Sequence, residues 1–193
     1  MGAYGLTTRE FLLAGSPTAL LRESFGRDGA GVDNAIAATG VMHCTAVPLL
    51  QGDTIAKVTF VTGATAASTP THSFVALYGP WVAGADPVLQ AQSADKLTTA
   101  MAANTVFTWS LTTAFTVATT GTYFVALSQT GTTICTVLGK SVGLNATAEI
   151  ALLAYNTGFP PLASTSGTAL AGTPPATHTS ITNVTTPLYF ILL

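Results

Sequence analysis

From residue 36 onward, apolar and polar positions alternate over many short stretches of the chain. In residues 107–111 the large apolar side chains Phe107, Trp109 and Leu111 fall on one face of an extended strand, while Thr108 and Ser110 fall on the other. Residues 54–61 alternate in the same way. Because a period of two residues is the signature of a half-buried strand, this part of the chain is predicted to be built from β-strands.

Strands are predicted wherever runs rich in Val, Thr, Phe and Tyr are bounded by Gly, Pro, Asn or Ser. The predicted strands cover residues 41–47, 54–61, 72–78, 87–92, 106–111, 122–128, 133–138, 149–155 and 188–193. No segment with helical periodicity separates them, so a parallel α/β sheet is not expected. The pattern favours an all-β fold, an antiparallel β-sandwich or jelly-roll-like domain over residues 36–193.

Residues 1–35 have a different pattern and are predicted to form a helical N-terminal arm. Thr7 and Glu10 have the spacing of a capping box, and Ser16 followed by Pro17 is typical of a second helix start, which Gly26 would end. Helices this short need a surface to lie against, either their own domain or a neighbouring subunit. The apolar side chains expected at this contact are Phe11, Leu12, Leu20, Leu21 and Phe25.

Two C-terminal features carry further expectations. Residues 158–186 contain four prolines among Ser, Thr, Ala and Gly and are predicted to form a long irregular crossing. Such a loop inside a compact domain is functional, mobile or laid against a partner. The apolar run 187–193 must be covered on both faces, either as a central strand, which we favour, or within an interface.

The charge of the chain is unusually low. Charged residues make up 7% of the sequence against 48% hydrophobic, and seven of them precede position 36. No apolar stretch is long enough to span a membrane, and the N-terminus is unlike an export signal, so we expect neither membrane insertion nor export. Six scattered Lys and Arg residues give no basis for nucleic-acid binding. A surface largely covered by neighbouring subunits explains the low charge best.

Residues capable of chemistry are few. His43 and Cys44 are strand neighbours that point to opposite faces, so His43 is expected at the strand surface and Cys44 as a free, buried thiol, like Cys135. We expect His72 to hydrogen bond a loop carbonyl and His178 to be exposed.

The acidic residues have turn roles in this interpretation: Asp53, Asp86 and Asp95 are predicted to accept backbone N–H bonds. No carboxylate pair suited to glycoside hydrolysis and no cluster of calcium ligands is visible. The sequence therefore predicts no catalytic residue, no metal site and no cofactor. Trp109 is expected in the core, whereas Trp81 is equally consistent with a lid on the core and with a partner contact.

Six stretches of the β region resemble, in order and spacing, the β-sandwich virion proteins of tailed actinobacteriophages, of the minor tail or head decoration type. They are VPLLQGD (47–53), TGATAA (62–67), THSFVALY (71–78), LQAQSAD (89–95), AANT (102–105) and GTYFVAL (121–127). The resemblance implies a non-enzymatic virion structural protein, with the virion as its location and other virion proteins as partners.

Within the virion, the chain's small size favours a capsid decoration subunit that binds the major capsid protein and forms a homo-oligomer such as a trimer. The alternative is a minor tail protein, or a receptor- or carbohydrate-binding module at the tail tip on which Tyr78 or Trp81 stacks against a sugar.

Overall fold

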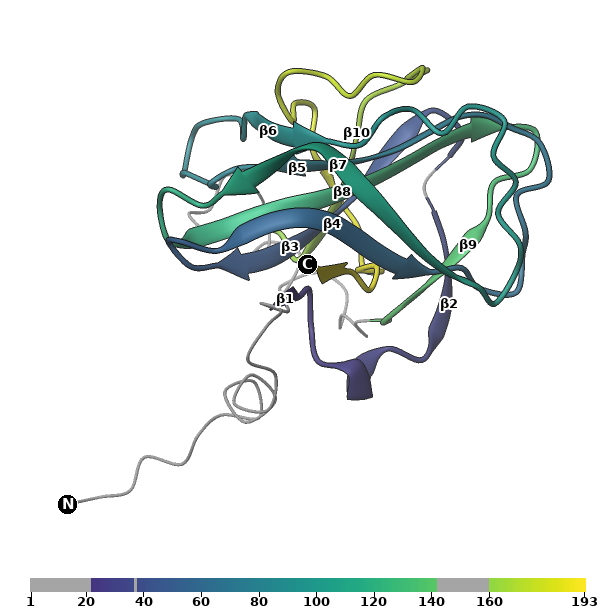
Figure 1. The fold of residues 1–193 in the computed structure, drawn as a ribbon, viewed down its shortest axis with the longest axis horizontal. Helices are drawn as coiled ribbons and strands as arrows, with labels where there is room; N and C mark the ends of the chain where they lie inside the picture. The colour runs from purple at the N-terminus through teal and green to yellow at the C-terminus, as the bar shows by residue number, and fades with distance from the viewer. Residues whose placement is uncertain (1–21, 37, 142–159) are drawn as a thin grey trace.

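The computed structural model describes residues 22–36, 38–141 and 160–193, which form a sandwich of antiparallel sheets (Figure 1). The strands are β1 (Arg22–Glu23), β2 (Val32–Ala35), β3 (Val41–Leu49), β4 (Thr54–Val61), β5 (Pro70–Tyr78), β6 (Leu89–Gln92), β7 (Val106–Thr116), β8 (Gly121–Gly131), β9 (Thr136–Gly139), β10 (Ala163–Ser166), β11 (Thr182–Asn183) and β12 (Ile191–Leu192). The helical structure among these residues is one 3-10 turn, Arg27–Gly29, and it is far too short to span a membrane.

The larger sheet has six strands in the order β11-β10-β3-β8-β5-β6, and the smaller has four in the order β1-β12-β4-β7. β2 and β9 form a separate two-stranded ribbon. β8 lies between β3 and β5, so the central pairs join segments far apart in the sequence. The antiparallel sandwich expected from the alternating pattern is confirmed.

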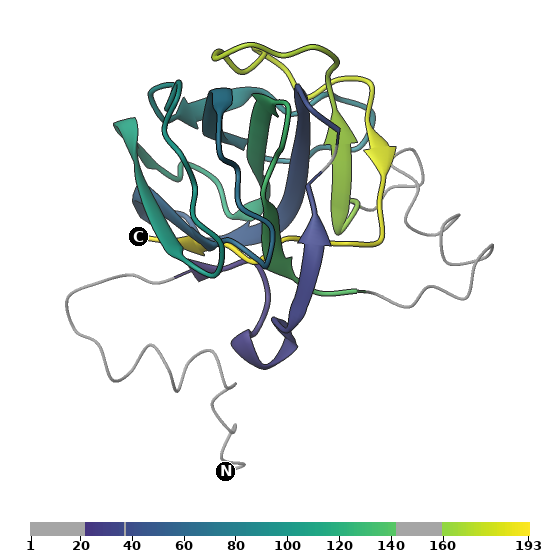
Figure 2. The same ribbon diagram turned by 90° about the vertical axis from the view of Figure 1, so that its right-hand side faces the viewer.

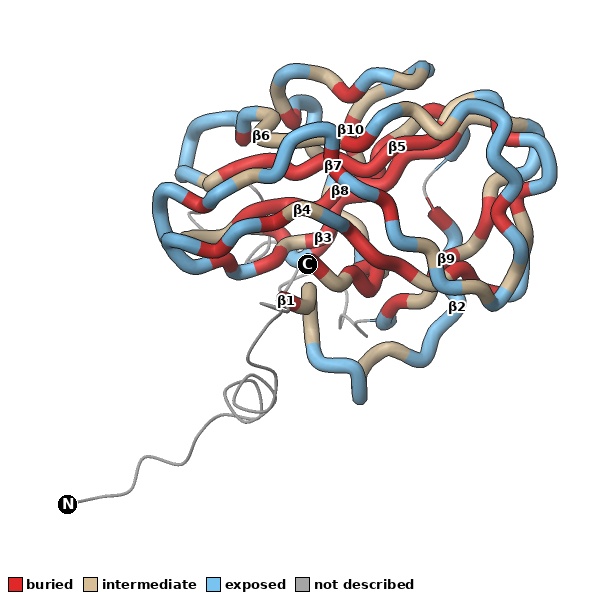
Figure 3. Tube along the Cα trace, viewed as in Figure 1, coloured by how far each residue is buried: buried red, intermediate tan, exposed pale blue. Residues whose placement is uncertain are grey.

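The main core is made of side chains from strands of both sheets. Figure 3 shows long buried stretches along β5 and β8 of the larger sheet. Its side chains come from alternate positions of the facing strands, as Val58 and Phe60 on β4 show. Trp109 packs edge-on against Phe60, with ring centroids 4.9 Å apart, so its predicted core position is confirmed. Both cysteines are free and buried, as expected.

Most of the predicted strands are present with small shifts at their ends. The strand expected over 133–138 begins later, at Thr136, and the one expected over 149–155 lies outside the described residues. The C-terminal run contributes β12, which lies between β1 and β4. The favoured central position of the C-terminal strand is therefore confirmed, although only Ile191–Leu192 has strand pairing.

The helix expected over residues 16–26 is wrong for its last part, because Arg22–Glu23 is a strand paired with β12. Pairing with β12 satisfies the backbone hydrogen-bonding groups of this segment instead. Ser24 N–H adds one more backbone hydrogen bond by donating to Phe190 O. Farther along the expected arm, β2 pairs with β9. Residues 22–35 therefore pack on the sandwich, and the rest of the predicted arm lies outside the described residues.

A buried ion pair fixes the start of this segment. The Arg22 guanidinium donates two hydrogen bonds of 2.6 Å to the Asp53 carboxylate, and both side chains are almost fully buried. Asp53 also accepts the Leu50 N–H, so its predicted turn role is confirmed. The second partner, Arg22, was not predicted. The pair ties β1 to the turn between β3 and β4.

Candidate functional site

The outer face of the six-stranded sheet carries a second apolar cluster, separate from the core between the sheets. Its buried members come from β3, β5 and β8: Met42, Cys44, Phe74, Ala76, Tyr78, Phe124 and Ala126. Their neighbours along the strands, such as Val75 and Val125, point into the main core. The central strands are thus buried on both faces, which explains the uninterrupted apolar runs 74–78 and 123–127.

We call the segment 163–186 the strap; Figure 2 shows it in yellow-green beside the six-stranded sheet. Its residues Leu170, Pro175 and His178 contact the cluster and cover it. Pro175 O accepts a hydrogen bond from the Tyr78 hydroxyl, and Leu170 O accepts one from the Thr130 hydroxyl. Leu170 itself packs against the cluster. The irregular crossing expected here therefore contains two short strands, β10 and β11, and lies on the chain's own sheet.

His178 of the strap is fully buried, so its predicted exposure is wrong. Its ring lies against Tyr78 and Phe124, with centroids 5.6 and 5.4 Å away. Burial lowers the pKa of His178 to about 4, and the charge of Asp86 opposes this only in part. Nε2 lies 3.5 Å from the Ser164 hydroxyl, while the buried Nδ1 has no hydrogen-bond partner. The ring is therefore neutral at pH 7 and packs as an apolar side chain.

His43 is also buried, contrary to its expected place at the strand surface. Its Nε2 lies 2.7 Å from Thr186 O, at the end of the strap. Burial lowers the pKa of His43 to about 4, opposed by this hydrogen bond. A neutral ring that donates from Nε2 fits the contact, so the side chain helps to hold the strap. Its neighbour Cys44 is buried in the second cluster, and burial raises the pKa of its thiol well above the ordinary value.

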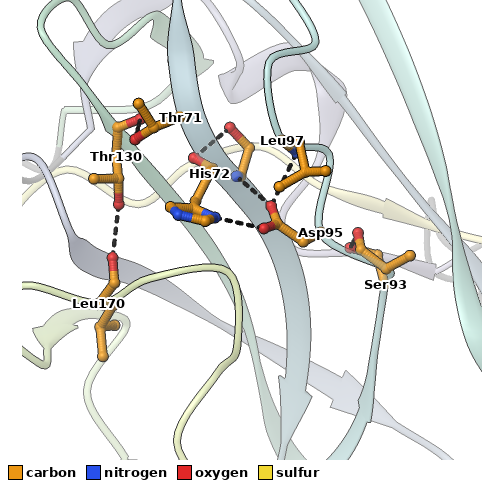
Figure 4. Close-up of polar contacts among 9 residues, drawn as sticks. Thr71, His72, Ser93, Asp95, Leu97, Thr130 and Leu170 are labelled. Carbon is orange, nitrogen blue, oxygen red and sulfur yellow. Dashed lines mark hydrogen bonds and ion pairs between the residues drawn. The ribbon is translucent and has the colours of Figure 1, made fainter.

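The described residues contain one histidine–carboxylate pair at an accessible position, His72 with Asp95 (Figure 4). The ring Nδ1 lies 2.5 Å from Asp95 Oδ2, and the carboxylate also accepts the N–H groups of Ser73 and Leu97. Burial raises the pKa of Asp95, but these hydrogen bonds outweigh it, so that pKa lies below its usual value. The turn role expected for Asp95 is confirmed, and His72 bonds this carboxylate instead of a loop carbonyl.

A catalytic dyad would need a nucleophile at the other ring nitrogen. The nearby hydroxyls of Thr71, Ser73, Ser93 and Thr130 each donate to a backbone carbonyl instead (Figure 4). A Cβ added to Gly172 would overlap the Asp95 carboxylate, so the strap backbone passes directly against the pair. The His72–Asp95 pair therefore holds the segment after β6 against β5, and the strap backbone packs on the pair.

The strap also forms an open cavity of about 370 Å³ beside β10 and β11. Its lining residues are Thr165, Ser166, Gly167, Thr168, Thr179, Ser180 and Thr182. Hydroxyl groups can both donate and accept hydrogen bonds, so a neutral polar ligand matches this lining better than an ion. Within the described residues, no cluster of His, Cys, Asp or Glu has the geometry to hold a metal ion.

Two of the predicted interface residues can be placed. Phe25 is half-buried and packs on Tyr189, with ring centroids 5.5 Å apart. Trp81 is half-buried against the second cluster, and its indole Nε1 is buried without a hydrogen-bond partner. Trp81 thus occupies the lid position, while a partner contact for either residue stays a prediction. The other four, Phe11, Leu12, Leu20 and Leu21, lie outside the described residues.

Neither a known protein-family profile nor a curated protein sequence matches the chain.

Proposed function

We propose that this chain is a non-enzymatic structural subunit of a phage virion, bound to the outside of the capsid shell as a decoration protein. The proposal rests on the resemblance of the six β-region stretches and on the nature of the strap surface. A place in the tail, as a minor tail protein, is the alternative within the same class.

The observation that carries the proposal is the absence of charge from the strap. Residues 160–193 contain no Asp, Glu, Lys or Arg, and β3, beneath the strap, contains none either. The exposed residues of the strap are mainly Thr, Ser and Ala. The buried centres of protein interfaces are depleted in charge, whereas free protein surfaces are rich in it. A face of this kind suits permanent contact with other subunits.

The chemistry of the accessible His72–Asp95 pair agrees with a structural role, because the hydroxyls around it are already bonded to carbonyls. The proposal therefore assigns this pair to folding and assigns the neutral strap face to partner binding.

The test compares purified phage particles with and without the gene. We expect the protein in wild-type particles at a copy number that scales with the major capsid protein. We also expect particles without it to lose surface density by electron microscopy and to regain it when purified protein is added. A few copies per particle, located at the tail, would favour the tail alternative. Absence of the protein from purified particles would refute both.

The hydroxyl-lined cavity favours a second candidate, a carbohydrate-binding module at the tail tip. A sugar ring offers neutral hydroxyl groups that match Thr168, Ser180 and Thr182. A glycan array with wild-type protein and a Ser180→Trp variant, which fills the cavity, tests it. Saturable binding that the variant loses would support this function, and no binding to any glycan would exclude it.

A further inference from the structure

We infer that the strap contains a flap that acid opens. The flap is residues 167–181, which connect β10 to β11. In acid it moves away from the six-stranded sheet and uncovers the second apolar cluster, while both sheets stay folded. The inference is independent of the virion proposal, because it rests on how the flap is hinged and held.

Both ends of the flap have residues in the left-handed backbone region. Gly167, directly after β10, has a φ of 81°, and Ser180, just before β11, has a φ of 53°. Ala169, near the first end, has a φ of 52°. This region is unfavourable for residues with a side chain, so the closed flap holds Ala169 and Ser180 in a costly conformation. Rotation at these positions relieves it and moves the flap on two hinges.

The closed flap is held by few hydrogen bonds. Among the described residues, three backbone bonds join it to the rest of the sandwich: Leu170 N–H to Gly40 O, His178 N–H to Pro87 O, and Leu89 N–H to Ala176 O. Two hydroxyl groups of the sheet also donate to flap carbonyls, and Figure 4 shows the one from Thr130. The pairing of β10 with β3 lies outside the flap. Opening therefore breaks local contacts and leaves the sheets intact.

The contact that responds to acid is the ring of His178, the flap's titratable side chain. It is fully buried against the rings of Tyr78 and Phe124. Its Nδ1 is buried without a hydrogen-bond partner, so the Nδ1–H of a protonated ring would have no acceptor in the closed flap. Burying such a charge is costly, whereas the open flap places the ring in water. Protonation therefore favours the open flap.

The groups that face this ring compensate its charge only in part. Asp86, in the loop between β5 and β6, raises the pKa of His178, but burial outweighs it and leaves that pKa at about 4. Ser164 of β10 offers a neutral hydroxyl 3.5 Å from Nε2. Tyr78 and Cys44 stay neutral in acid, because burial raises the pKa of each above its ordinary value.

The flap's other contact with titratable groups lies at Gly172, which packs against the His72–Asp95 pair. The pKa of Asp95 lies below its usual value, because its hydrogen bonds outweigh burial, so the carboxylate is ionised at pH 5. His72 can donate to it from Nδ1 in either protonation state. This contact is therefore the same at pH 7 and pH 5, and the response to acid belongs to His178.

The size of the response follows from the two pKa values of His178, about 4 in the closed flap and the ordinary 6.5 in the open one. Above pH 6.5 the opening equilibrium constant does not change with pH. Below it the constant rises about tenfold per pH unit until it levels off near pH 4. Between pH 7 and pH 5 the flap should therefore open about 20-fold more often.

The test is amide hydrogen exchange on the full chain at pH 7 and pH 5, corrected for intrinsic exchange rates. The amides of Leu170, His178 and Leu89 report opening, because their hydrogen bonds join the flap to the sandwich. Val125 of β8, the strand between β3 and β5, reports global unfolding. We expect the three flap amides to be less protected than Val125 at both pH values. Their protection should fall about 20-fold from pH 7 to pH 5.

Two variants remove the titrating group, His178→Leu and His178→Gln. In both, the protection of the Leu170 and Leu89 amides should be the same at pH 7 and pH 5. His43→Leu is the matched control, because it removes the other buried histidine, which bonds Thr186 O beyond the flap, and it should keep the 20-fold fall. Gly167→Ala places a side chain at a left-handed hinge and should lower protection about 10-fold at both pH values.

Four results would each overturn the inference. They are flap amides as protected as Val125 at pH 5, a fall in protection that persists in both His178 variants, a fall that disappears in His43→Leu, and unchanged protection in Gly167→Ala. All four concern the flap alone, so they are separate from the question of whether purified phage particles contain the protein.

Discussion

Acid should destabilise this protein through two buried histidines, His178 in the strap and His43 on β3. His43 and His178 have folded-state pKa values of about 4, against 6.5 for free histidine. The unfolded chain therefore binds more protons between these pH values, so the free energy of unfolding falls as pH drops from about 6.5 to about 4. A shift of this size corresponds to about 3 kcal/mol for each histidine, and the steepest combined slope is about 2.7 kcal/mol per pH unit.

Urea unfolding measured at closely spaced pH values tests this. His178→Leu keeps an apolar side chain in the cluster and removes one titrating group, so the slope between pH 6.5 and pH 4 should fall by about half. Ser166→Ala, which removes a hydrogen bond within the strap to Thr179 O, is the matched control and should lower stability by the same amount at every pH. A wild-type free energy of unfolding that is flat over this range, or an unchanged slope in His178→Leu, would refute the reasoning.

Three further predictions concern the ion pair, the strap and the thiols. Arg22→Met leaves the Asp53 carboxylate buried without its main partner and should cost about 3–5 kcal/mol in chemical denaturation. The double variant with Asp53→Leu should recover much of this loss, and additive losses would contradict the expectation. Thr130→Val removes a 2.7 Å hydrogen bond to the strap and should cost about 1 kcal/mol, with faster exchange confined to strap amides. Cys44 and Cys135 should react with a thiol reagent only at the rate of unfolding, because both are buried; rapid modification of the native protein would disprove their burial.

The sequence predicted the strands well because alternation reports burial on one face. It gave the wrong burial for His43, since a polar residue in a β-type run is ordinarily on the exposed face. It was wrong for His178 too, since an irregular crossing rich in Pro and Thr ordinarily runs over the surface. The informative signal was the pair of unbroken apolar runs, 74–78 and 123–127. Such runs indicate strands covered on both faces, and something therefore had to cover the outer one.

The N-terminal expectation failed over residues 22–26 for a different reason. Capping and stop signals describe local preferences, which are worth about 1 kcal/mol, and tertiary pairing outweighs them. Here β1 gains main-chain bonds to β12, and Arg22 gains its bidentate contact with Asp53 across 31 positions of sequence. Neither partner is visible from the local sequence.

The sequence by itself determined the class of fold, the positions of most strands, the core position of Trp109 and the free, buried state of both cysteines. These follow from residue type and from a period of two, which act over a few neighbouring positions. Only the tertiary structure decided that the strap covers the sheet's outer face, that Asp95 holds His72, and that Arg22 pairs with Asp53. Those features depend on which distant segments meet, and local preferences do not encode the long-range pairing that sets them.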